Sequence, residues 1–423
     1  MRRQYQTIEM YRIIAALICI CNVGNIVSVD PLAEEYGKLV FSSLLYRHGD
    51  RSIENTYPMD PYANKSYWPM GFGQLTLTGI EEHYELGVWL RKRYSGWLPE
   101  VYSTEDIYIR SSDYDRTIMS AEANLDGLYP PVEPKKWNQL IPIHTVPKLQ
   151  DNVLAMSEAC PLYSQELEKI QNDEDVQSFY AQFSSVIKYI FNNAGATMEE
   201  KSKPIYFITT VFQALTIESK FNYTLPDWTK RIFPEPLTTI AIKNYELSTH
   251  NNIMKRLKCG PLLKDIVTHM NEKKHGSLNP NRKLWIYSGH DTTIYSLLNT
   301  MGINNNLLVP YAAVLMIELR LNNTGNYVVT VSYRNTSIHD PYLLQVPGCD
   351  SVACDLDQLT EVLIPFIPND WDTECKINVK NNTSELLIFF LGVISAIVII
   401  LILYAIANKR ILHYGKRSYY YTF

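Results

Sequence analysis

The sequence predicts an α/β fold in which helices flank a mainly parallel central sheet, with a smaller, mostly helical inserted domain and a single transmembrane helix. Three short strand-like segments, residues 39–45, 107–112 and 283–288, contain or precede arginine, histidine or aspartate near their carboxyl ends. Residues 160–270 instead have mostly helical patterns, and residues 386–407 are apolar without a charge. Because ligands bind beyond the carboxyl ends of strands in open α/β sheets, the polar residues at these ends are candidate site residues.

The N-terminal residues 1–29 are predicted to be a secretory signal peptide. An apolar run at residues 13–29 follows three arginines and ends directly before Asp30 and Pro31. A basic start, a short apolar run and small residues near the cleavage point are typical of such peptides. A buried N-terminal helix is the alternative, and the shortness of the run disfavours it.

The first strand, residues 39–45, leads into a segment that contains Arg47, His48 and Arg51. Two guanidiniums that are never deprotonated flank one imidazole in this segment. The arrangement suits a phosphate group with a nitrogen placed to attack it. Taken alone, this segment could also be a solvated basic turn. The choice between a phosphate site and such a turn depends on segments later in the chain.

A helix, a strand and a second helix are expected next. The first helix is predicted at residues 77–94 with Thr78 as its N-cap, the strand at residues 107–112 and the second helix at residues 115–128. The strand carries Arg110, which is either another phosphate ligand or an ordinary surface arginine.

Residues from about 130 to 270 form the predicted helical insertion. Proline lacks the N–H that a helix interior needs, and four prolines are expected to break these helices: Pro204, Pro226, Pro234 and Pro236. Strand character then returns at residues 283–288, 312–321 and 327–333.

The strand at residues 283–288 is followed by His290 and Asp291. A carboxyl group can supply or take a proton, and an imidazole can donate to a phosphate oxygen. Asp291 has an alternative role as the N-cap of a helix that starts near Thr292. Polar residues at three separate strand ends together favour a phosphate site over three unrelated structural roles.

Residues 386–407 form the predicted transmembrane helix. At about 1.5 Å per residue the run spans roughly 33 Å, which is enough for a hydrocarbon core of about 30 Å. The flank at residues 408–423 carries four basic and no acidic residues, so the positive-inside rule places it in the cytosol. We therefore expect a type I membrane protein with residues 30–384 on the lumenal or extracellular side.

The cytosolic tail ends in Tyr420, Tyr421, Thr422 and Phe423. A tyrosine followed at the third position by a bulky apolar residue fits the sorting signals that send membrane proteins to endosomes and lysosomes. A chance match in a tyrosine-rich tail is the alternative. The expected locations are the lysosomal or endosomal membrane and the cell surface, with sorting adaptors as tail partners.

Six N-x-S/T sequons lie before the apolar run, in agreement with an oxidising, glycosylating compartment. Two of them, at Asn381 and Asn382, lie too close to the bilayer for modification to be expected. Glycosylation is expected at the other four: Asn64, Asn222, Asn322 and Asn335.

The net charge of −5 indicates neither nucleic acid nor an anionic membrane surface as a partner. The histidines outside the three strand ends are scattered, and no metal-ligand cluster is evident. The sequence therefore predicts no metal and no other cofactor, and its expected ligands are small-molecule phosphate monoesters.

Seven motifs occur in order along the chain. They are RHGDRS at 47–52, WPMGFGQLT at 68–76, HYELG at 83–87, YIRSS at 108–112, PIHTVP at 142–147, YSGHDTT at 287–293 and WDTEC at 371–375. With them the chain resembles the histidine acid phosphatases, in particular the branch of the animal prostatic and lysosomal enzymes, from about Lys38 to Cys375. Gly289 stands where relatives commonly have alanine, and both residues are small.

The resemblance implies an acid phosphatase in which His48 is the nucleophile and forms a phosphohistidine. Asp291 is then expected to protonate the leaving alkoxide, and His290 to donate to the phosphate. No metal is needed, because arginines neutralise the charge that Mg²⁺ would otherwise take. The phosphoryl oxygens are expected to be clamped by three arginines, Arg47, Arg51 and Arg110.

By the same resemblance, disulfides are expected between Cys160 and Cys375 and between Cys349 and Cys354. Cys259 is then left over. It is either a buried free thiol, since free cysteine packs as a small hydrophobe, or the partner in an intermolecular bridge.

Two other functions are open on the same fold. An inositol-phosphate-selective phosphatase is one, although such enzymes commonly have proline where this chain has Ile53. The other is a catalytically silent receptor or adhesion ectodomain, which would not need Asp291. A homodimer is also expected, because the segment around His144 resembles part of the family's dimer contact.

Overall fold

The chain forms two compact units, residues 1–375 and residues 376–423, and each is described by itself. The computed structural model describes residues 30–131, 138–155, 160–202, 204–377 and 383–417. Four predictions lie outside these residues: the signal peptide, the sequons at Asn381 and Asn382, and the tail signal at Tyr420 and Phe423.

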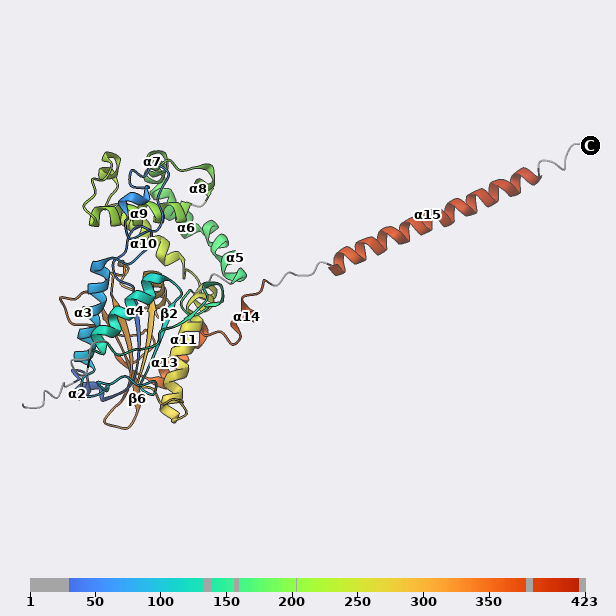
Figure 1. The fold of residues 1–423 in the computed structure, drawn as a ribbon. Coiled ribbons are helices and arrows are strands. Elements are labelled where there is room, and N and C mark those ends of the chain that lie inside the picture. Colours follow the sequence, from blue (N-terminus) through green and yellow to red (C-terminus); the bar gives the residue numbers. More distant parts are fainter. Residues whose placement is uncertain (1–29, 132–137, 156–159, 203, 378–382, 418–423) are drawn as a thin grey trace, which may run out of the picture. The chain divides into compact units, whose positions relative to one another are not determined.

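The first unit is built around one eight-stranded sheet with the spatial order β3-β2-β4-β1-β5-β6-β7, in which β8 also pairs with β6 (Figure 1). The strands are β1 (Lys38–Arg47), β2 (Ile107–Ser112), β3 (His144–Val146), β4 (Leu284–Gly289), β5 (Val314–Leu321), β6 (Tyr327–Arg334), β7 (Tyr342–Leu344) and β8 (Ala353–Asp355).

The α/β prediction is confirmed, but the sheet is mixed rather than mainly parallel. β3, β2, β4 and β1 pair in parallel. β5 pairs antiparallel with β1, and β6 pairs antiparallel with β5, β7 and β8. For β5 and β6 the reason is local, because β5 ends at Leu321 and β6 begins at Tyr327, and so short a connection allows only an antiparallel pair. The antiparallel pairing of β5 with β1 joins strands that are far apart in the sequence.

Helices cover both faces of the sheet (Figure 1). They are α3 (Leu77–Arg93), α4 (Asp115–Leu128), α11 (Asn252–His275), α12 (Asp291–Thr300) and α13 (Leu356–Leu363). Two short helices, α2 (Ala33–Tyr36) and α14 (Trp371–Glu374), complete this part of the chain. Successive strand residues point to opposite faces. Leu44 therefore belongs to the core beneath α3 and α4, and Leu45 to the core beneath α11, α12 and α13.

The predicted insertion contains α5 (Pro161–Lys169), α6 (Glu174–Gln182), α7 (Ser184–Ala194), α8 (Met198–Ser202), α9 (Pro204–Lys220) and α10 (Leu237–Leu247). These helices gather beyond one end of the sheet (Figure 1). Much of the insertion packs around a separate apolar core, which includes Ile208 and Ile240 and also Ile53, Tyr57 and Trp68 from the segment after β1. Two of the predicted breaks mark helix starts, since α9 begins at Pro204 and Pro236 directly precedes α10.

Two predicted helix caps are shifted. α3 begins at Leu77, and the hydroxyl of Thr76, not Thr78, accepts from the Gly79 N–H. Asp291 is the first residue of α12 rather than its N-cap, because His290 holds the extended backbone at that boundary. The carboxylate of Asp291 is thereby available for another role.

Both predicted disulfides are present, Cys160–Cys375 and Cys349–Cys354. Cys259 is a free thiol with an exposed fraction of 0%. Full burial leaves it no access to a second chain, so the intermolecular bridge is excluded for this conformation.

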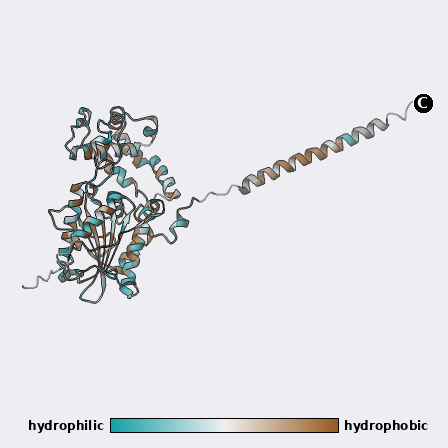
Figure 2. Cartoon of the chain, in the orientation of Figure 1, coloured by the Kyte–Doolittle hydropathy of each residue, from teal (hydrophilic) through white to brown (hydrophobic). Residues whose placement is uncertain are grey.

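The second unit contains α15 (Thr383–Arg417). Its stretch Phe390–Lys409 has a mean hydropathy of 2.9 and is long and apolar enough to cross a membrane, by length and composition. Figure 2 shows the apolar residues running along the middle of this helix. The apolar helix that the sequence predicts is therefore formed.

Candidate active site

His48 lies directly after β1, at the carboxyl edge of the parallel half of the sheet. Its backbone N–H donates to the Gly289 carbonyl at 3.0 Å, and its carbonyl accepts from the Ala312 N–H at 3.3 Å. The side chain is 2% exposed. These contacts with both flanking segments fix the position of the imidazole.

One hydrogen bond determines the tautomer of His48. Its Nδ1 lies 2.8 Å from the Gly49 carbonyl oxygen, and a carbonyl can only accept, so Nδ1 carries the proton. The neutral ring then has its lone pair on Nε2, the nitrogen that can act as a nucleophile.

His290 and Asp291 follow β4, the strand next to β1. The ring of His290 lies 5.5 Å from that of His48, centroid to centroid, and its Nε2 lies 2.9 Å from Ser112 Oγ. The Asp291 carboxylate pairs with Arg47 at 3.0 Å and accepts from the Tyr245 hydroxyl at 3.2 Å. The structure thus brings the predicted nucleophile and the predicted proton donor together.

These side chains line a cavity of about 190 Å³, which we call the phosphate cavity. Its lining includes two imidazoles, three cationic side chains and one aspartate: His48, His290, Arg51, Arg116, Lys258 and Asp291. The amide of Gln213 also lines it and accepts from Arg51 Nη2 at 3.3 Å.

Arg47 approaches from the other side of Asp291. It donates to the Val309 carbonyl at 2.5 Å and lies 4.0 Å from the centroid of the Tyr311 ring. It lines a smaller neighbouring cavity of about 80 Å³, whose wall also includes Arg51 and Asp291. The two predicted arginines Arg47 and Arg51 therefore both lie at the site.

Arg110 does not lie there, which corrects the predicted clamp. Its guanidinium donates to the buried Asp151 carboxylate at 2.5 Å, and it does not line the phosphate cavity. The carboxylate also accepts from the backbone N–H groups of Val153 and Leu154. Arg110 thus has a structural partner of its own.

Arg116 takes the place that was predicted for Arg110. It is the second residue of α4, lines the phosphate cavity and pairs with Glu54 at 3.3 Å. A signal for it was present in the sequence, because a helix was expected to begin at residue 115, just beyond the end of the second strand. An arginine in the first turn of such a helix lies at the same edge as the strand ends.

Burial and positive charge act together on the imidazoles. Burial lowers the pKa of His48 well below its ordinary value, and Arg47, His290 and Arg116 lower it further. Burial and Arg116 lower the pKa of His290 to about 3. Both rings therefore stay neutral in acid solution, which keeps a nucleophilic nitrogen available there.

Opposing effects act on Asp291. Burial raises the pKa of its carboxyl group, but the guanidiniums of Arg47 and Arg51 outweigh burial and leave the pKa below its ordinary value. Burial and the Asp291 charge raise the pKa of Tyr245, which therefore remains a hydroxyl donor. A negative phosphate among the arginines would reduce their hold on the Asp291 charge and favour its protonation.

One group with metal-ligand spacing occurs among the described residues, formed by Asp173, Asp175 and His250. Both aspartates are exposed, and none of the three lines the phosphate cavity. We assign this group no role.

We expect Arg116→Ala and Arg110→Ala proteins to fail in different ways. Loss of Arg116 should lower kcat/KM for a phosphate monoester by roughly 10²–10³-fold, which is the usual effect of removing one hydrogen-bond donor that stabilises charge in a transition state. Loss of Arg110 leaves Asp151 buried without its cation and should cost on the order of 2 kcal/mol of folding stability. Steady-state kinetics and thermal unfolding of both proteins check this, and a large kcat/KM loss in the folded Arg110→Ala protein would restore Arg110 to the clamp.

A family model described as the histidine phosphatase superfamily (branch 2) matches residues 32–334. The chain belongs to this family. Human prostatic acid phosphatase is 38% identical to this histidine phosphatase, over 82% of this chain and 90% of the relative. Lysosomal acid phosphatase of Xenopus laevis is 35% identical, over 89% of this chain and 88% of the relative.

Two solved phytase structures share the fold. The phytase from Citrobacter braakii aligns with a TM-score of 0.59 at 19% identity, over 81% of this chain and all of that chain. The apo form of Hafnia alvei phytase gives 0.60 at 16% identity, over 80% of this chain and 98% of that chain. At these identities the likeness shows the fold alone.

Proposed function

We propose that this histidine phosphatase is an acid phosphatase that hydrolyses phosphate monoesters through a phosphohistidine on His48. The observation that carries the proposal is the neutral His48 ring, protonated on Nδ1 by its bond to Gly49, in a cavity with Arg51 and Arg116. This is an unprotonated nitrogen beside two cations. The acid phosphatase relatives support the same reaction.

In the first step His48 Nε2 attacks phosphorus, and the bond from phosphorus to the ester oxygen breaks. Arg47, Arg51 and Arg116 hold the phosphoryl oxygens, because planar guanidiniums bind such oxygens well. His290 is assigned as a further donor to the phosphate. In the second step water attacks the phosphohistidine and returns His48 with its lone pair on Nε2.

Asp291 gives a proton to the leaving oxygen in the first step and takes one from water in the second. Its pKa is low beside Arg47, so a source of the first proton is required. A phosphate monoester supplies it, because the monoanion that predominates below about pH 6 carries one proton. The bound ester becomes a dianion among the arginines, and Asp291 holds the proton.

This assignment predicts the pH dependence of hydrolysis. kcat/KM for phenyl phosphate, whose phenolate needs a proton to leave, should be highest in acid, because His48 stays neutral there. It should fall by up to about tenfold per pH unit above about pH 6 as the proton is lost. Assays of the full chain in detergent from pH 4 to 8, with EDTA, check this. Turnover that is highest at pH 8, or that EDTA abolishes, would contradict the mechanism.

An absence of turnover at every pH in a folded preparation has a separate meaning. It would favour a silent receptor or adhesion ectodomain that keeps the fold of a phosphatase. Selectivity for inositol phosphates would instead appear as preferred hydrolysis of phytate over simple monoesters.

We further propose a type I membrane protein of the lysosomal or endosomal membrane, with the first unit on the lumenal side. The apolar helix α15, the basic residues after it and the lysosomal acid phosphatase relatives support this location. Glycosylation at Asn64, Asn222, Asn322 and Asn335, the homodimer and the sorting adaptors stay predictions.

A further inference from the structure

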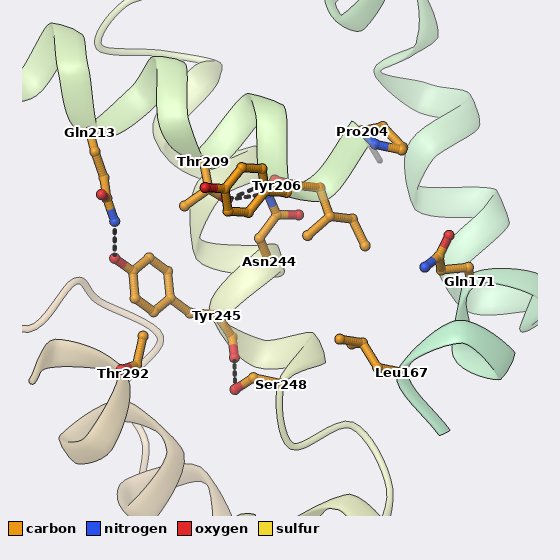
Figure 3. A pocket seen from close by; sticks show the side chains of 11 residues that line it. Leu167, Gln171, Pro204, Tyr206, Thr209, Gln213, Asn244, Tyr245, Ser248 and Thr292 are labelled. Atoms are coloured by element: carbon orange, nitrogen blue, oxygen red, sulfur yellow. Dashed lines mark hydrogen bonds between the residues drawn. The ribbon is translucent and has the colours of Figure 1, made fainter. Parts of the chain in front are cut away.

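A second cavity of about 400 Å³ adjoins the phosphate cavity. Its walls come from α5, α9 and α10 of the insertion and from the start of α12 (Figure 3). Two residues, Gln213 and Thr292, line both cavities. The volume lies within the range of sites that bind small organic molecules.

The chemistry of this cavity differs from that of its neighbour. Among the residues that the structure describes, none of the eleven that line it is charged, whereas the phosphate cavity is lined by arginine, lysine, aspartate and glutamate. Leu167, Pro204, Ile205 and Tyr206 supply apolar surface (Figure 3). A charged or strongly hydrated group would lose its water here without gaining an ionic partner.

Two polar side chains in the wall, Asn244 and Ser248, are already bonded within the protein. Asn244 Nδ2 donates to the Ile205 carbonyl and to Thr209 Oγ1, and its Oδ1 accepts from Tyr180. Ser248 Oγ donates to the Tyr245 carbonyl at 2.7 Å (Figure 3). These two groups need no bond from an occupant, and together with the apolar residues of the wall this favours an apolar occupant.

The position of the cavity identifies that occupant. Thr292 directly follows Asp291. Tyr245, another lining residue, donates a hydrogen bond from its hydroxyl group to the Asp291 carboxylate. Because Asp291 protonates the leaving oxygen in the proposed reaction, that oxygen must lie close to it. The organic group attached to the oxygen then lies beside the wall that both cavities share.

We propose that this leaving-group cavity binds the organic part of the substrate and selects phosphate monoesters of apolar alcohols. The inference rests on the proposed phosphatase function and adds the substrate class to it. It also gives the helical insertion a role in specificity, since α5, α9 and α10 supply most of the wall.

A series of n-alkyl phosphates, from ethyl to hexyl, tests the proposal on the full chain. The alkoxide leaving groups have similar basicity, so a trend in kcat/KM along the series reports binding of the alkyl group rather than intrinsic reactivity. Each methylene that enters the cavity should raise kcat/KM by up to roughly fourfold. A series that stays flat from ethyl to hexyl phosphate would overturn the proposal.

A matched pair of variants locates the effect. Leu167 lines the cavity and Leu162 does not, although both are half-buried leucines of α5 that pack against the same apolar cluster. Leu167→Gln should lower kcat/KM for hexyl phosphate on the order of fivefold and leave ethyl phosphate unchanged. Leu162→Gln should change neither substrate. Partitioning of hexyl phosphate into detergent affects all three proteins equally.

The outcomes separate this proposal from the one on which it rests. If kcat/KM depended on alkyl-chain length equally in the wild type and the Leu167→Gln protein, the alkyl group would bind elsewhere and the inference would be wrong. Retained ethyl phosphate turnover shows that a variant is folded and active. Only a wild type that hydrolyses none of the esters, ethyl phosphate included, would count against phosphatase function itself.

Discussion

A His48→Ala protein is expected to hydrolyse 4-nitrophenyl phosphate roughly 10⁴-fold more slowly than the wild type. The reason is specific to this ring, because in the proposed mechanism it supplies the atom that bonds to phosphorus. Arg47, Arg51 and Arg116 would still bind phosphate, so KM should change much less than kcat. Steady-state kinetics at acid pH give both values.

A control histidine separates chemistry from folding. His269 is partly buried and stacks on Trp285, with ring centroids 3.8 Å apart, but it does not line the phosphate cavity. A His269→Ala protein should keep wild-type kcat per folded molecule. Denaturation of the wild type during turnover in alkaline detergent should trap phosphate on the chain, because a phosphoramidate bond is stable in base, and the His48→Ala protein should trap none. A His48→Ala protein that keeps more than about a hundredth of kcat would exclude His48 as the nucleophile.

The site residues that could be predicted from the sequence are those whose positions depend on the strand or helix pattern directly beside them in the chain. His48 follows a strongly apolar strand and His290 follows another, so both lie at strand ends whatever the tertiary packing. The helix expected at residues 115–128 is α4 without a shift of either end. Local patterns also set the hairpin formed by β5 and β6, but no local pattern indicates that β5 pairs antiparallel with β1.

The prediction that Arg110 binds phosphate was wrong because of the position of this residue within its strand. Arg110 lies two residues before the end of β2, where its Cα pairs with Tyr287 and His144. It therefore belongs to the strand rather than to the edge beyond it. Its partner Asp151 is 41 residues away, and no local pattern links the two. The leaving-group cavity could not be predicted either, because its lining residues are spread along the chain from Leu167 to Thr292.

An Asp291→Asn protein is expected to lose activity in a way that depends on the leaving group. For phenyl phosphate, whose phenolate is a strong base, kcat/KM should fall by roughly 10²–10⁴-fold, the usual contribution of a general acid. For 4-nitrophenyl phosphate the loss should be much smaller, because its weakly basic phenolate leaves without a proton. The two substrates differ little in shape, so binding in the leaving-group cavity contributes little to the difference.

The comparison must be made on kcat/KM. Both substrates give the same phosphohistidine, so kcat becomes equal for the two if its hydrolysis limits turnover. kcat/KM reports only the steps up to the release of the alcohol, in which Asp291 is the proposed acid. In the second step the same residue takes a proton from water, so the phosphoenzyme should also accumulate in the Asp291→Asn protein.

Electrostatic side effects of the substitution do not mimic this result. Asparagine removes the negative charge beside Arg47, but Arg47 keeps its bond to Val309 and its contact with Tyr311. The freed positive charge changes phosphate binding equally for both esters. Equal losses on phenyl and 4-nitrophenyl phosphate would therefore mean that Asp291 acts through charge alone, and the proton donor would have to be sought elsewhere in the cavity.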